Sequence, residues 1–244
     1  MTLKTKGRLY FSAWDILSCP LGVYYKKKRF PLPLVHPEIA RIRENYARVA
    51  ETGKLIQQKL RRKWMADHVL LAAENKIQND WDLWCRFDAL CKINGQFILY
   101  EIKGVGEDFF ERIRKTGEPR KDNRIQLIIY HHFLRQKYPE LKPILLYVNR
   151  KDPEQTLEIP LEYSNDEVEE IHHKVLTLKD GIEKEIPPEP AGNITFDPYE
   201  NRYMVNPVAI TCEYHGLCNG DDYWYPKATE EVDRLNGKNK EGGN

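Results

Sequence analysis

Residues 85–103 read C-R-F-D-A-L-C-K-I-N-G-Q-F-I-L-Y-E-I-K, and this stretch decides the fold. Two runs of mainly apolar and aromatic residues flank Asn94-Gly95, a dipeptide that strongly indicates a β-hairpin because both residues tolerate positive φ. With a two-residue turn, Asp88 lies opposite Glu101 on the partner strand. Side chains alternate between the two faces of a strand, so these carboxylates and Lys103 are predicted to share one face.

The carboxylate pair has two interpretations. Like charges that face each other across a ribbon are destabilising, and a divalent cation held by oxygen ligands would remove the repulsion. The alternative is a solvated pair at the edge of a sheet. The same register places Arg86 opposite Lys103. It also places Cys91 on the other face of the ribbon, where a core position is expected.

Composition limits the class of protein. The chain has 244 residues, which predicts one domain over residues 1–226 followed by a polar, disordered tail over 227–244. A net charge of +1 excludes a uniformly basic surface, so any contact with DNA must come from local patches. The sequence contains no run of 18 apolar residues, so no membrane span is predicted. The first residues lack the apolar core of a signal peptide. Five cysteines without secretion signals favour reduced thiols or metal ligation, and a cytoplasmic location.

Three basic clusters interrupt the balanced composition. Such clusters are often only solvated faces, but tyrosines precede the first of them, and aromatic neighbours favour contact with phosphates or bases. The candidate DNA contacts are Lys26, Lys27, Lys28, Arg29, Arg61, Arg62, Lys121 and Arg124.

Hydrophobic periodicity and capping patterns predict the remaining elements. A long helix from residue 37 to about 75 carries Gln57 at the edge of its apolar stripe. A helix over about 124–137 presents Gln126 and Tyr130 one turn apart on a single face. The other expectations are a short capped helix over 12–19, a flexible or DNA-facing loop over 104–122, strands over 143–148 and 156–163, a capped helix starting near Ser164, and a loop over 187–207.

The set of motifs resembles a known family. A helix with Gln57, the hairpin "F-D-A-L…L-Y-E-I-K" and the helix "R-I-Q-L-I-I-Y" follow one another as in the PD-(D/E)xK nucleases of the RecB type, which include CRISPR-associated RecB-like nucleases and viral exonucleases. The resemblance implies an α/β, restriction-endonuclease-like fold with a central mixed sheet flanked by helices. It implies a metal-dependent deoxyribonuclease in a prokaryotic or viral setting, with DNA as its partner. Protein partners in recombination, CRISPR adaptation or viral replication are further implications.

The resemblance also assigns roles within the site. Asp88, Glu101 and the backbone carbonyl of Ile102 would bind Mg²⁺ or Mn²⁺, and Lys103 would orient and activate the attacking water. Gln126 and Tyr130 would position DNA and brace the site. Gln57 stands where the family often has a metal-binding histidine, so it is a weaker ligand.

Three activities are compatible with this resemblance. The leading hypothesis is an exonuclease on single-stranded or end-accessible DNA. The alternatives are a nuclease-like DNA-binding or adaptor subunit with weak or no catalysis, and an endonuclease.

Many of these nucleases hold an iron–sulfur cluster with one early cysteine and three late cysteines spaced C-x2-C-x5-C. Cys19, Cys212 and Cys218 match three of these positions, but Ala209 takes the fourth. His215 lies between the two late cysteines. Three readings stay open: unmetallated packed cysteines, an iron–sulfur cluster completed by another ligand, or a zinc site with three cysteines and His215.

Overall fold

A computed structural model describes residues 11–33, 35, 37–77, 79–197, 202–215, 217 and 224–241, the last five of these by backbone alone. The chain forms two compact units: the first holds Met1–Ile16 and Arg48–Leu176, the second Leu17–Ala47 and Thr177–Asn244. The helices are α1 (Ala13–Leu17), α2 (Pro20–Lys27), α3 (Pro37–Ala66), α4 (Glu107–Thr116), α5 (Lys121–Leu134), α6 (Asn165–Glu183), α7 (Pro207–Thr211) and α9 (Trp224–Glu241). The strands are β1 (Phe11–Ser12), β2 (Leu70–Ala72), β3 (Lys76–Ile77), β4 (Leu83–Arg86), β5 (Ala89–Ile93), β6 (Gln96–Val105), β7 (Lys142–Asn149), β8 (Thr156–Pro160), β9 (Ile194–Asp197) and β10 (Arg202–Val205).

The first unit is built on a five-stranded mixed sheet with the order β2-β5-β6-β7-β8. Its β5–β6 hairpin has the predicted register, with Ile93 opposite Gln96, and the turn residues Asn94 and Gly95 have φ values of 50° and 85°. β6 and β7 run parallel, whereas the other neighbouring strands are antiparallel. The parallel pair needs a crossover connection, and α4 and α5 supply it.

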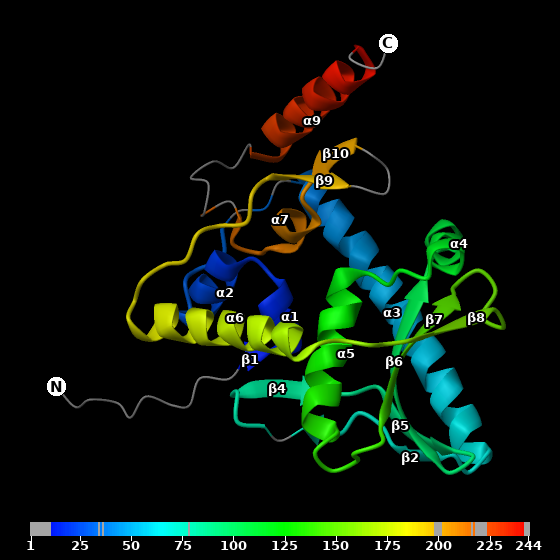
Figure 1. The fold of residues 1–244 in the computed structure, drawn as a ribbon. Helices are drawn as coiled ribbons and strands as arrows, with labels where there is room; N and C mark the ends of the chain where they lie inside the picture. Colours follow the sequence, from blue (N-terminus) through cyan, green and yellow to red (C-terminus); the bar gives the residue numbers. More distant parts are fainter. Residues whose placement is uncertain are drawn as a thin grey trace. The chain divides into compact units, whose positions relative to one another are not determined.

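Helices cover both faces of this sheet (Figure 1). On one face, Ile56, Leu60 and Trp64 of α3 pack against Tyr100, Ile102 and neighbouring residues of the central strands. Side chains alternate along β6, so Glu101 and Lys103 point to the opposite face, where α5 lies. The hairpin therefore places Tyr100 and Ile102 against α3, and Glu101 and Lys103 on the face where α5 lies.

The second unit has its own core. β9 and β10 form an antiparallel hairpin, and Ile210 of α7 and Trp224 of α9 belong to one buried cluster. Asn236 of α9 accepts a 2.8 Å hydrogen bond from the backbone N–H of Tyr203 and donates a 2.9 Å bond to its carbonyl, which docks α9 on β10.

Several local predictions are confirmed. Ser12 and Asp15 exchange reciprocal capping hydrogen bonds at the start of α1. Ser164 and Glu167 do the same at α6. β7 and β8 lie where strands were expected, although β8 ends at Pro160, earlier than predicted. Among the described residues, no helix is long and apolar enough to cross a bilayer.

Other predictions are wrong. α3 ends at Ala66, and β2 and β3 follow within the segment predicted to continue the helix. The segment 104–122 contains α4, which buries Phe110 and Ile113 and carries acidic residues in its first turn and basic residues in its last, the charge order that complements the helix dipole. β9 and β10 lie in the segment 187–207, which was expected to be a loop.

Two further corrections concern the ends of larger elements. The expected disordered tail is largely the helix α9, because Trp224 and Ala228, one turn apart, are both buried. Arg86 does not pair with Lys103. Instead β4 leaves the ribbon at the bend around Asp88, and Arg86 pairs with Lys76 of β3.

Candidate active site

Asp88 and Glu101 are brought together by the hairpin. Asp88 lies at the bend directly before β5, and its Oδ2 accepts a 2.8 Å hydrogen bond from the backbone N–H of Ile102 on β6. Glu101 precedes Ile102 and has only 2% of its surface exposed. The ladder continues towards this end from Ala89 opposite Tyr100, so the two carboxyl groups occupy neighbouring positions on adjoining segments.

A chain of polar contacts leads from Glu101 to α5. Lys103 Nζ lies 2.7 Å from Glu101 Oε1 and donates a 2.8 Å hydrogen bond to Gln126 Oε1. Gln126 Nε2 in turn donates to the hydroxyl of Tyr130 at 2.9 Å. The two polar residues predicted to share one face of α5 therefore hold the lysine of the hairpin in place.

α3 contributes two side chains from the other direction. Gln57 Nε2 donates to Asp88 Oδ2 and to the carbonyl oxygen of Ile102, both at 3.1 Å. Arg61, one turn later, contacts Asp88 Oδ1 at 3.5 Å and pairs with Glu74. Gln57 thus lies in the site, but its amide nitrogen, rather than its oxygen, faces the would-be metal ligands.

Burial sets the protonation of the two acids. Burial and, after it, the Glu101 charge raise the pKa of Asp88 to about 8, against the lowering effects of Lys103, the Ile102 N–H and Arg61. Burial also raises the pKa of Glu101, against the charge of Lys103. The pKa of Lys103 is lowered by burial but raised more by Glu101 and Asp88, so the net shift is upward and the lysine stays charged.

The donor set fits a hard divalent cation. Glu101 Oε2 is buried and has no hydrogen-bond partner among the described residues, while its Oε1 contacts Lys103. Asp88 Oδ2 and the Ile102 carbonyl oxygen are further donors, and both lie 3.1 Å from Gln57 Nε2. Oxygen-only ligands suit Mg²⁺ and Mn²⁺, and a cation would offset the cost of burying negative charge on Asp88 and Glu101.

Asp88 opens onto a pocket of about 530 Å³. Five of the lining residues were predicted site residues or DNA contacts: Gln57, Arg61, Asp88, Gln126 and Tyr130. The other lining residues had no predicted role: Ser12, Ala13, Trp14, Lys54, Gln58, Glu74, Trp84 and Arg86. The parallel pairing of β1 with β4 places Ser12 beside Trp84 and brings the region of Trp14 to the pocket.

The two tryptophans are unusually open for their size. Trp14 is 58% exposed and Trp84 is 45% exposed. The Lys76 ammonium and the Arg86 guanidinium lie 5.8 Å and 5.6 Å from the centre of the Trp84 ring, at cation–π distance. Alternation along Leu83–Arg86, with Leu83 and Cys85 buried, is the sequence signal that could have placed Trp84 and Arg86 on the open face.

The predicted DNA contacts are dispersed. Arg61 lies in the site, whereas Arg124 binds Glu167 through contacts of 2.8–2.9 Å and donates to the Glu162 carbonyl at 2.6 Å. Arg62 and Lys121 are exposed on α3 and α5. Lys28 pairs with Glu185 at 2.8 Å in the second unit, to which Lys26, Lys27 and Arg29 also belong.

The cysteines fall into two groups. Cys85 and Cys91 are buried in the first unit, and burial raises the pKa of each thiol to about 12, as expected of unreactive core residues. Cys19 and Cys212 lie with His215 in the second unit, with one potential ligand atom from each residue within 4.8 Å of the others. Ala209, at the remaining position of the cluster pattern, is fully buried in α7. Cys218 is outside the described residues.

No protein-family model and no curated protein matches the sequence. Solved structures do match. The crystal structure of SSO0001 shares 19% identity over 88% of this chain and 88% of its own, with a TM-score of 0.51. The chain has the restriction-endonuclease-like fold. The structure of the alkaline exonuclease LHK-Exo from Laribacter hongkongensis matches 57% of this chain and 70% of its own, at 16% identity and a TM-score of 0.46. Its complex with dAMP gives a TM-score of 0.45 at 17% identity. The fold that the resemblance implied is thus confirmed by the match to SSO0001.

Proposed function

We propose that this chain is a divalent-metal-dependent deoxyribonuclease that hydrolyses phosphodiester bonds, acting as an exonuclease on single-stranded or end-accessible DNA. The observation that carries the proposal is that Glu101 Oε2 is buried without a hydrogen-bond partner among the described residues. Lys103 contacts the same carboxylate, and Asp88 accepts from the N–H of the neighbouring Ile102. Two acids, a carbonyl and a lysine in this arrangement are suited to binding a cation and to acting on a phosphate beside it.

Asp88, Glu101 and the Ile102 carbonyl would hold Mg²⁺ or Mn²⁺. When bound, such an ion supplies Lewis-acid activation of a water molecule and neutralises charge at the scissile phosphate. Asp88 must lose its proton before it can bind the ion, and its pKa of about 8 makes this step dependent on pH near neutrality.

Lys103 is positioned to act on water and phosphate. Two of the three N–H donors of its ammonium group go to Glu101 and Gln126, which leaves one for the attacking water or for a phosphate oxygen. Tyr130 accepts from Gln126 and lines the pocket, so its own O–H can donate to a non-bridging phosphate oxygen. Gln126 and Tyr130 therefore hold the lysine in place and contact the DNA.

The open tryptophans support a preference for unpaired bases. Aromatic side chains stack on the bases of single strands, and base stacking within a duplex hides the faces that they would contact. Trp14 and Trp84 line the same pocket as Asp88, with Lys54 and Arg86 as neighbouring cations for phosphates. A single strand, or the frayed end of a duplex, can enter such a pocket with its bases against the tryptophans.

A labelled oligonucleotide tests the chemistry. We expect the wild type to degrade it in the presence of Mg²⁺ or Mn²⁺ and to be inactive in EDTA, while Asp88→Ala and Glu101→Gln are inactive under all conditions. Glu158→Gln is a matched control: Glu158 lies on β8 of the same sheet, accepts a hydrogen bond from Tyr100, and does not line the pocket. If wild type cleaves no faster than Asp88→Ala, the enzyme proposal is wrong.

Substrate form tests the mode of cleavage. An exonuclease leaves closed circular DNA intact and degrades the same DNA once it is linearised, whereas an endonuclease cuts the circle. Trp84→Ala should slow the degradation of single strands, because stacking is worth about 1–3 kcal/mol per base. Equal loss of activity on blunt duplexes and single strands would argue against a stacking role.

A second candidate is a DNA-binding subunit with weak or no catalysis. The orientation of Gln57 favours it, because the amide N–H groups engage Asp88 and the Ile102 carbonyl, two of the three oxygen donors that a metal ion needs. This candidate predicts salt-sensitive DNA binding that persists in Asp88→Ala, without turnover by the wild type.

A further inference from the structure

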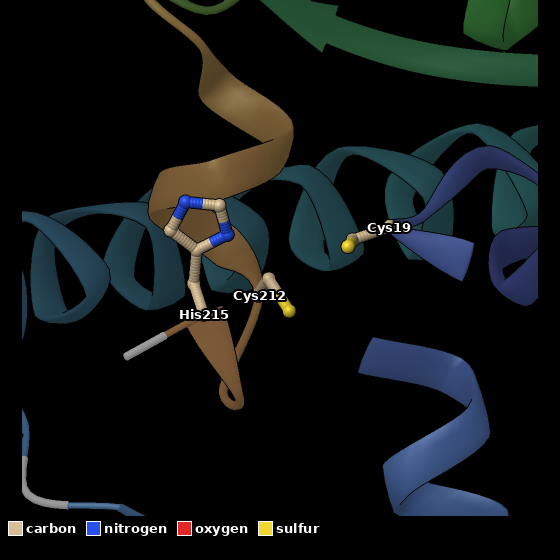
Figure 2. A group of neighbouring side chains, drawn as sticks. All are labelled: Cys19, Cys212 and His215. Atoms are coloured by element: carbon tan, nitrogen blue, oxygen red, sulfur yellow. The ribbon is translucent and has the colours of Figure 1, made fainter. Parts of the chain in front are cut away.

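Three potential ligands converge in the second unit, and none of them is among the residues that line the pocket. Cys19 immediately precedes α2, Cys212 immediately follows α7, and His215 lies in the turn after it (Figure 2). One Sγ or ring-nitrogen atom from each residue lies within 4.8 Å of the others. Cys19 is almost 200 positions away from Cys212 and His215 in the sequence, so only the fold of this unit brings it to them.

The spacing of the donor atoms matches a single ion. Zinc–sulfur bonds of about 2.3 Å at tetrahedral angles place two sulfur ligands about 3.8 Å apart, and a sulfur–nitrogen pair slightly closer. The three donor atoms lie within 4.8 Å of one another, so they need to move together only slightly to reach these distances. In a four-iron cluster each protein ligand binds a different iron atom, so the donor atoms must lie farther apart.

Neighbouring groups hydrogen-bond to these side chains and orient them, as they do in metal sites. His215 Nε2 lies 2.6 Å from Asn193 Oδ1, which fixes Nε2 as the protonated nitrogen and assigns the lone pair to Nδ1. The backbone N–H of Ala191 donates to Cys19 Sγ at 3.3 Å, a bond that stabilises a thiolate. Metal-binding histidines usually donate their second ring N–H to such an oxygen acceptor.

Backbone contacts fix the Cys212 turn. The Arg43 guanidinium donates to the carbonyl oxygens of Ile210 at 2.9 Å and Cys212 at 2.7 Å, and its positive charge offsets negative charge on the thiolates. Gly22 allows the close approach of Cys212: a Cβ at that position would lie 2.3 Å from Cys212 Sγ. The first turn of α2 is therefore shaped to receive this sulfur atom.

The four-iron cluster that the resemblance implies does not fit the described residues. Ala209 offers no ligand at the position where the pattern requires a cysteine, and it is fully buried. We propose instead that Cys19, Cys212 and His215 bind one zinc ion, which links the segment before α2 to the turn after α7. Two thiolates and an imidazole are ligands typical of structural zinc. Cys218 continues the spacing Cys212-x2-His215-x2-Cys218 in the sequence and lies outside the described residues.

Metal content of the full-length protein tests the proposal without any activity assay. We expect purified wild type to retain about one zinc ion per chain after exhaustive dialysis, as structural sites do. Cys19→Ala and His215→Ala should lose it. His215→Cys should keep it, because a thiolate can replace the imidazole. Cys91→Ala, a buried cysteine of the first unit, is the matched control and should retain zinc.

Thermal unfolding gives a second readout. After the metal is removed with a strong chelator, added zinc should raise the Tm of the wild type and of His215→Cys, but not that of Cys19→Ala or His215→Ala, because a ligand that binds only the folded state stabilises it. Equal zinc content in wild type, Cys19→Ala and His215→Ala would overturn the proposal. So would stoichiometric iron and labile sulfide with broad visible absorption in an anaerobic preparation. Neither result depends on whether the protein cleaves DNA.

Discussion

Replacing Asp88 by asparagine should stabilise the metal-free protein while it abolishes cleavage. Oδ2 of Asp88 accepts hydrogen bonds from the Ile102 N–H and from Gln57. An asparagine with its oxygen at the same place keeps both of these bonds. Its amide nitrogen replaces Oδ1 and loses only the 3.5 Å contact with Arg61, which also pairs with Glu74. What disappears is a negative charge that burial disfavours.

The magnitude follows from the pKa of Asp88. The ordinary value is 3.8, and burial together with the Glu101 charge raises the pKa in the folded protein to about 8. Between these values the unfolded chain has lost the proton that the folded protein retains, so the free energy of unfolding falls as pH rises. The fall is about 1.4 kcal/mol per pH unit, or about 3 kcal/mol between pH 5 and pH 7.5.

Urea unfolding of the wild type and Asp88→Asn in EDTA, at several pH values from 5 to 7.5, measures this difference. Tryptophan fluorescence reports mainly on the first unit, which holds four of the five tryptophans. The variant should gain stability over the wild type steadily as pH rises. Added Mn²⁺ should reduce the stability difference between the two proteins, because it stabilises only the wild type. At a hundredfold excess over its Kd, the ion would raise the free energy of unfolding of the wild type by about 2.7 kcal/mol.

One result would refute the reasoning. If the stability difference between the two proteins does not change from pH 5 to pH 7.5, Asp88 is not a buried acid with a raised pKa. The cation site built on that acid then loses its electrostatic basis, whatever the nuclease assays give.

Three other predictions follow from the same geometry. Lys103→Met should slow cleavage by about 10²-fold or more while DNA affinity measured by anisotropy stays within a few-fold; a parallel loss of affinity would contradict a chemical role. Gln57→His should lower the Mn²⁺ concentration needed for half-maximal cleavage, because imidazole is a better ligand than an amide; an unchanged metal requirement would place residue 57 outside the coordination sphere. Arg124→Ala should lower the free energy of unfolding by about 1 kcal/mol, because the ion pair with Glu167 is lost, and should leave DNA affinity unchanged. Weaker DNA binding without a loss of stability would instead show that Arg124 contacts DNA.

The sequence was sufficient for features set by neighbouring residues. Asn94-Gly95 requires positive φ at both turn positions, and this determines the hairpin register and hence the position of Glu101 beside Asp88. Capping pairs such as Ser164 and Glu167 span three residues and form inside their own helix. These interactions have low loop-closure entropy, so local pattern and local structure agree.

Only the tertiary structure decided which distant segments meet. Trp14 reaches the pocket because β1 pairs with β4 across about seventy residues, and no periodicity within either segment encodes that pairing. The sequence predicted that Arg124 contacts DNA, but its guanidinium binds Glu167. Glu167 also accepts the capping hydrogen bond at the start of α6. The convergence of Cys19 with Cys212 and His215 has the same cause. Such contacts depend on how whole elements pack, and packing is a property of the assembled core rather than of any window of the chain.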